Sequence, residues 1–110
     1  MPTILNTGTA SLTLNTPSTF YTSSSNKHYS AWVNLDNMDT GDTTTLTVNI
    51  KVLSGDSFTG FYKQVFTDVD GGLDEPVFFI PFFSAPYGVE FILEQTTGTG
   101  RDYKWQVIEP

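Results

Sequence analysis

Apolar and polar side chains alternate along residues 44–52, and this period of two restricts the fold more than any other feature of the chain. Successive side chains of a β-strand point to opposite faces of the sheet, whereas a helix repeats about every 3.6 residues. The segment therefore predicts a strand with one buried face, made by Leu46, Val48, Ile50 and Val52.

The same alternation recurs in residues 29–35, 89–94 and 103–108. In residues 29–35, Tyr29 begins the apolar face and Trp32 lies on the more polar face. Threonine and aromatic residues are frequent, while Ala, Leu, Glu, Lys and Arg are sparse, and this usage favours sheet over helix. Weaker strand candidates are residues 10–14, 58–67 and 77–83.

These segments, about seven in number, are separated by turn-forming residues and by no helical crossover. They predict an all-β fold, an antiparallel β-sandwich with a jelly-roll-like arrangement. We expect one domain over residues 10–110, with residues 1–9 as an extended N-terminal arm and residues 17–27 as a long loop. Turn-forming residues at 96–102 predict that the last two strands form a hairpin.

Charge and composition exclude several kinds of function. Twelve acidic side chains outnumber five basic ones, and a net charge of −7 would repel nucleic acid. The chain has no cysteine, so it offers no disulfide, thiolate metal site or cysteine nucleophile. We recognise neither a leader peptide nor a membrane span, so we expect synthesis in the cytoplasm without a nucleic-acid or membrane partner.

One aromatic run departs from strict alternation. Residues 77–83 would place apolar side chains on both faces of a strand, and Pro81 favours a sheet edge or a bulge because it cannot donate to a ladder hydrogen bond. One interpretation is a strand covered on both sides by protein layers. The other is a patch closed by another subunit or partner, because monomers rarely leave such patches in water. We predict this interface for Val77, Phe78, Phe79, Ile80, Pro81, Phe82 and Phe83.

Side chains suited to catalysis or metal binding form no recognisable motif. Acidic residues gather at 68–75 and again at Asp36, Asp39 and Asp42, but the EF-hand spacing is missing and ordinary acidic turns explain them. A calcium site in residues 68–75 stays an open alternative. His28 is the only histidine and no serine lies in a Gly-x-Ser-x-Gly context, although a pair of carboxylates acting on a glycosidic bond is conceivable. We therefore expect no enzyme activity and no cofactor.

Aromatic side chains suggest a second kind of function. Tyr29, Trp32 and Tyr62, together with Trp105, could present a flat surface to a sugar ring, as in a carbohydrate-binding or adhesin-like module. Packing in the core is the competing explanation, because aromatic residues carry much of the apolar area that a small domain buries.

Three stretches in the second half of the chain carry a resemblance to a known kind of protein: the run Gly71–Pro81, the entry Tyr87-Gly88-Val89 and the stretch Glu94–Thr99. Through these stretches the chain resembles small β-rich virion proteins of tailed viruses. It implies a capsid decoration or cement subunit that stabilises a viral shell. Its implied partners are a major capsid or other virion protein and further copies of itself, with a trimer favoured. It also implies that residues 1–9 lie on a neighbouring subunit.

Overall fold

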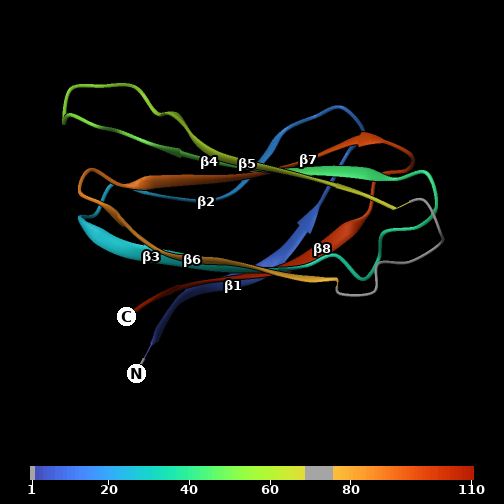
Figure 1. Cartoon of the computed structure of the whole chain (residues 1–110), viewed down its shortest axis with the longest axis horizontal. Helices are drawn as coiled ribbons and strands as arrows, with labels where there is room; N and C mark the ends of the chain where they lie inside the picture. The colour runs from blue at the N-terminus through green and yellow to red at the C-terminus, as the bar shows by residue number, and fades with distance from the viewer. Residues whose placement is uncertain (1, 69–75) are drawn as a thin grey trace.

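A computed structural model of the chain describes residues 2–68 and 76–110. The described part forms eight β-strands in two antiparallel sheets of four, packed as two layers (Figure 1). The predicted all-β antiparallel sandwich is therefore confirmed. The strands are β1 (Thr3–Ser11), β2 (Ser18–Ser23), β3 (Lys27–Asn34), β4 (Thr43–Ile50), β5 (Thr59–Thr67), β6 (Val77–Ala85), β7 (Val89–Thr97) and β8 (Asp102–Glu109).

The strands pair in a nested order. Sheet A has the order β1-β8-β3-β6, and sheet B has the order β2-β7-β4-β5. Four strand pairs enclose one another along the chain, and successive pairs alternate between the two sheets. From the innermost to the outermost they are β4 with β5, β3 with β6, β2 with β7 and β1 with β8. The chain is thus one long hairpin wrapped around a core, and Figure 1 shows its two ends side by side.

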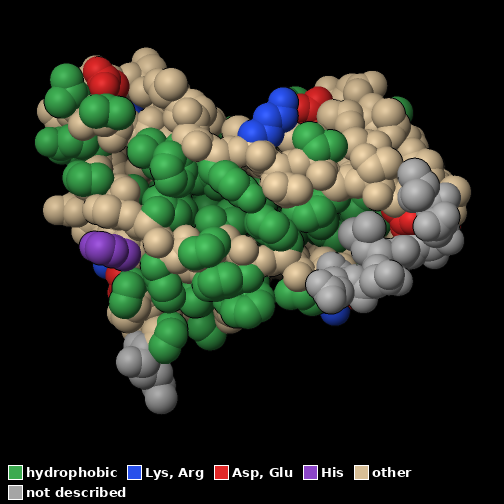
Figure 2. Space-filling model, in the orientation of Figure 1, with side chains coloured by type: hydrophobic (Ala, Val, Ile, Leu, Met, Phe, Trp, Pro, Cys, Tyr) green, Lys and Arg blue, Asp and Glu red, His purple; other side chains and the backbone are tan. Residues whose placement is uncertain are grey.

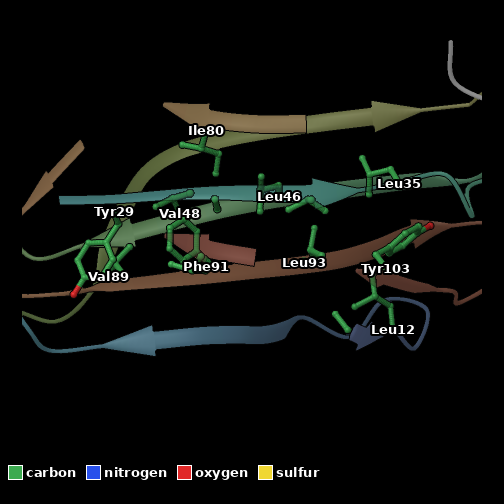
Figure 3. Close-up of a cluster of buried hydrophobic side chains, with 14 of the residues drawn as sticks. Leu12, Tyr29, Leu35, Leu46, Val48, Ile80, Val89, Phe91, Leu93 and Tyr103 are labelled. Atoms are coloured by element: carbon green, nitrogen blue, oxygen red, sulfur yellow. The ribbon is translucent and has the colours of Figure 1, made fainter. Parts of the chain in front are cut away.

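The core forms where the inner faces of the two sheets meet (Figure 3). The side chains predicted to form the apolar face of residues 29–35 are all buried, with at most 1% of their area exposed. Leu46 and Val48 are fully buried as predicted, but Val52 is 74% exposed because β4 ends at Ile50. The fully buried side chains of sheet B include Val89, Phe91 and Leu93.

The predicted arm and the predicted long loop are both wrong. Thr3–Ser11 is strand β1, which pairs with β8 at the edge of sheet A. Ser18–Ser23, inside the expected loop 17–27, is strand β2 at the edge of sheet B. Both are edge strands with a register shift, so few of their side chains are buried and a regular apolar pattern is missing.

The predicted hairpin at 96–102 is also wrong. β7 pairs with β2 and β4, whereas β8 pairs with β1 and β3, so the connection after Thr97 crosses from sheet B to sheet A. The apolar faces of the two strands therefore meet across the core instead of lying side by side in one sheet. Within residues 2–68 and 76–110 the structure has no helix that could span a membrane.

Candidate interaction surface

Strand β6 carries the predicted interface residues and forms one edge of sheet A. Phe78, Ile80 and Phe83 turn inward, where Ile80 is 4% exposed and the two phenylalanines pack against the core. Val77 and Phe82 are 50% and 39% exposed. The strand therefore contributes to the core with one set of side chains and offers apolar surface with another.

A bulge at Pro81 produces this division. Tyr29 pairs with Phe83 and Ala31 with Ile80, so Ser30 faces two residues of β6, Pro81 and Phe82. The extra residue lets Phe82 stay exposed while Phe83 returns to the interior. The Ser30 hydroxyl donates a hydrogen bond to the carbonyl oxygen of Ile80, which satisfies a backbone acceptor beside the bulge. Proline at a bulge of an edge strand is the position predicted for it.

The outward side chains of β6 join a tryptophan of β3. Trp32 is paired in register with Phe79, and their ring centroids lie 4.5 Å apart. Trp32 is 41% exposed on the outer face of sheet A, as the alternation predicted. We call this surface the outer aromatic patch, and it consists of Trp32, Val77, Phe79, Pro81 and Phe82.

A second group of aromatic side chains lies where edge strand β5 of sheet B faces β6. Phe61 contacts Phe83 with 5.1 Å between ring centroids, and Phe66 contacts Phe78 edge-on at 4.9 Å. Phe61 is still 49% exposed. Figure 2 shows hydrophobic side chains gathered between the two layers in this view. Apolar surface therefore continues around β6 from the outer face of sheet A to the side of the sandwich.

A shallow hollow of about 540 Å³ lies on the outer face of sheet A, next to Trp32. The strand register explains its lining, because one row across the sheet contains Thr7, Gln106 and Trp32 and the next contains Thr9, Lys104 and Asn34. The hollow therefore combines an exposed indole with hydroxyl, amide and ammonium groups. Its lining residues are Thr7, Gly8, Thr9, Trp32, Asn34, Val77, Lys104, Trp105 and Gln106.

The structure does not bring the three predicted platform residues onto one surface. Tyr29 is fully buried, and its hydroxyl donates to the carbonyl oxygen of Ser25 over 2.7 Å. Tyr62 lies on β5 beside Phe78, on the side of the sandwich. The predicted flat surface is therefore wrong for Tyr29, which packs in the core. Of the three residues only Trp32 lines the hollow; Trp105 also belongs to its lining but packs against the core.

Asp42 is a buried structural carboxylate. It accepts hydrogen bonds from the backbone N–H groups of Asp39 and Thr99, over 2.9 and 3.2 Å, and from the guanidinium of Arg101. Burial raises the pKa of Asp42, but these hydrogen bonds and the Arg101 charge lower it by more, so its pKa lies below the ordinary value. The hydrogen bond from Asp39 is local, as expected of an acidic turn, whereas those from Thr99 and Arg101 tie the β3–β4 connection to the β7–β8 connection, which was not predicted.

The remaining candidates for chemistry are dispersed. His28 is exposed on β3, and among the described residues no three His, Asp or Glu side chains form a group that could hold a metal ion. Most of the acidic stretch 68–75 lies outside the described residues, so the calcium alternative stays a prediction there.

The amino-acid sequence did not allow us to predict the hollow on the outer face of sheet A. Its polar residues come from β1, β3 and β8, and alternation identifies an outward face without saying which strands are neighbours. Comparison of the chain with protein-family models, curated proteins and solved structures finds no match. The function therefore has to be argued from the surface itself.

Proposed function

We propose that this chain is a non-enzymatic virion structural protein, a capsid decoration or cement subunit that stabilises a viral shell through protein contacts. It is made in the cytoplasm of the host and ends in the virion. Its partners are further copies of itself, with a trimer as the favoured state, and a major capsid protein or another virion protein. The observation that carries the proposal is the outer aromatic patch on β6.

The exposure of the outer aromatic patch is typical of a contact surface and not of a strand that is covered on both faces. Val77 and Phe82 keep 50% and 39% of their area exposed, and Trp32 keeps 41%. Folded monomers rarely leave contiguous apolar patches in water, and aromatic side chains are the residues most enriched at energetic centres of interfaces. An acidic surface with such a patch favours a specific apolar partner site and disfavours nucleic acid.

The strand order supports the jelly-roll-like arrangement that we expected from the sequence. Eight strands wound as nested antiparallel pairs into two sheets of four are the arrangement that jelly rolls use. Viral capsid proteins and lectins both include jelly rolls, so the fold is compatible with more than one function. The surface has to distinguish them.

Binding to shells tests the proposal directly. Purified protein is mixed with empty capsid shells of tailed phages, and co-sedimentation is measured for the wild type and for Phe82→Asp. A charge at the centre of an aromatic interface should cost about 2 kcal/mol or more, which is roughly a thirtyfold rise in Kd. Sedimentation velocity of the free protein gives its state of assembly.

Leu53→Asp is the matched control, because Leu53 is 64% exposed but lies on the loop between β4 and β5 of sheet B. It should bind like the wild type. The proposal would be contradicted if the wild-type chain is monomeric and binds none of the shells. It would also be contradicted if Phe82→Asp binds shells as tightly as the wild type.

The hollow beside Trp32 favours one other function, a carbohydrate-binding or adhesin-like module. Sugar sites combine an aromatic face with a few polar groups that fix orientation. Here Trp32 stands beside Asn34, Lys104 and Gln106. This arrangement needs no contribution from Tyr29 or Tyr62.

A glycan array decides between the two functions. If the module binds sugar, Trp32→Ala should abolish a specific signal while circular dichroism stays unchanged. Phe61→Ala, which removes an aromatic side chain of comparable exposure from sheet B, should retain it. An array without signal at high protein concentration removes this candidate.

A further inference from the structure

Strand β1 is the least protected sheet edge among the described residues. Natural edge strands are usually blocked by charged side chains, proline or bulges, because their free N–H and C=O groups can pair with another chain. β1 has the sequence TILNTGTAS, with neither charge nor proline. Beyond a register shift at Ile4–Asn6, it pairs with β8 without interruption from Asn6 to Ser11.

The other three edge strands each carry a stronger block. β6 has the Pro81 bulge, and β5 has a register shift with the charged Lys63 close to it. β2 is only six residues long, and a register shift between Thr19 and Tyr21 divides it. Asn6–Ser11 is therefore the longest straight edge without a block in the described structure.

We propose that β1 is the pairing site for a second copy of this chain. The two β1 strands run antiparallel across a two-fold axis normal to the sheet, and two four-stranded sheets become one continuous sheet. The charge pattern favours a second copy as the occupant. The chain has a net charge of −7, yet the pairing edge has none, so two acidic molecules can approach here without like charges facing each other.

The alternation of β1 restricts how the two strands pair. Thr7 and Thr9 line the hollow on the outer face, whereas Ala10 is buried on the inner face. Because a two-fold axis normal to the sheet keeps each face on its own side, residues of the outer face must lie opposite each other. The registers that pair most of Asn6–Ser11 therefore place Thr7 opposite Thr9, or Thr9 opposite itself with Thr7 opposite Ser11. Cross-strand pairs of hydroxyl residues stabilise sheets.

This pairing would also join the two hollows. Thr7 and Thr9 belong both to the pairing strand and to the lining of the hollow, so the hollows of two copies would lie beside the shared axis. The proposal does not rest on the outer aromatic patch, which lies around the opposite edge of sheet A. The two-fold contact is also separate from the contacts of the trimer proposed above, because it closes with two copies. A variant at Phe82 should therefore leave the pairing intact.

Engineered cysteines test the proposal, because the chain has none of its own. Thr7→Cys, Thr9→Cys and the double variant are oxidised in dilute solution and run on non-reducing gels. Opposite Cα atoms in antiparallel strands lie about 4.5–5.5 Å apart, which suits a disulfide. At least one of the three variants should form a covalent dimer. Thr19→Cys on β2 is the control, since Thr19 is also exposed on an edge strand.

A charge on the edge gives the second measurement. Thr7→Lys places like charges near each other across the axis, while its own neighbour on β8, Gln106, is uncharged. It should raise the dimer Kd roughly tenfold in sedimentation velocity. Thr19→Lys should leave the dimer unchanged, and far-UV circular dichroism should show that both variants are folded. The proposal is overturned if no β1 cysteine variant crosslinks above the Thr19→Cys level, or if Thr7→Lys dimerises like the wild type.

Discussion

Replacing Asp42 with asparagine removes one negative charge and one acceptor from the contact between two connections of the sandwich. In the native protein, one carboxylate oxygen accepts from the N–H of Thr99, and the other accepts from the N–H of Asp39 and from Arg101. An asparagine amide has a single oxygen. Whichever way it is oriented, its NH₂ group faces at least one donor, so at least one hydrogen bond is lost.

The size of the effect follows from these contacts. A hydrogen bond to a charged group is worth about 1.5–3 kcal/mol, and the charge opposite Arg101 is lost as well. Arg101 keeps some solvent contact, with 30% of its side chain exposed, so it is not left as a fully buried charge. We expect Asp42→Asn to lower the free energy of unfolding by about 3 kcal/mol, or roughly 12–24 °C in Tm.

The pH dependence adds a second, independent expectation. Because the pKa of Asp42 is lowered in the folded state, its stabilisation is fully present above the unfolded pKa of about 3.9 and disappears as the pH falls through the native pKa. Asp42→Asn lacks this term. The difference in stability between the wild type and the variant should therefore narrow as the pH falls from about 5 to about 2.

Urea unfolding followed by tryptophan fluorescence measures both effects. Asp36→Asn is the control, because Asp36 is an exposed aspartate of the same connection and should change stability by less than about 0.5 kcal/mol. A loss below about 1 kcal/mol for Asp42→Asn at neutral pH would refute the reasoning. A difference that stays constant with pH would refute the assignment of the lowered pKa.

Two further predictions use the same unfolding assay. Gly88→Ala should destabilise the fold by more than about 3 kcal/mol, because φ is +100° and a Cβ atom would lie 2.0 Å from the carbonyl oxygen of Ser23. Gly41→Ala has a similar φ of +88° but open space around it, so it should cost only about 1–2 kcal/mol; equal losses would contradict the steric argument. Tyr103→Phe should cost about 1 kcal/mol, because the buried Gln95 acceptor loses one of two hydroxyl donors and keeps the other; a loss above about 3 kcal/mol would contradict this.

Side-chain alternation predicted the strands whose inner face is fully covered. The alternation is regular in residues 29–35 and 89–94 because each inward side chain is buried against the opposite sheet. β1 and β2 could not be recognised in this way. β1 buries Ala10 alone, and in β2 the register shift lets the neighbours Phe20 and Tyr21 both pack against the core. Edge strands with such irregularities lose the period on which the prediction depends.

The candidate surface was predicted in part for a related reason. Residues 77–83 stood out because their pattern fits neither a half-buried strand nor a turn, and Pro81 does lie at a bulge on an edge strand. Which side chains surround them depends on strand order. The contact of Trp32 with Phe79 and the rows that line the hollow follow from the pairing of β3 with β6 and β8, and alternation within one strand carries no information about its neighbours.

The nested strand order governs the sequence of events during synthesis. β8 is made after β1 and β3, yet in sheet A it lies between them, and it is the only described strand that pairs with β1. The β4–β5 pair can zip up early because its strands are close in the chain, whereas the β1–β8 pair closes the widest loop. Sheet A of a nascent polypeptide therefore stays incomplete, and the phenylalanines of β6 stay exposed, until β8 has been synthesised. During that interval it should depend on chaperones to avoid aggregation.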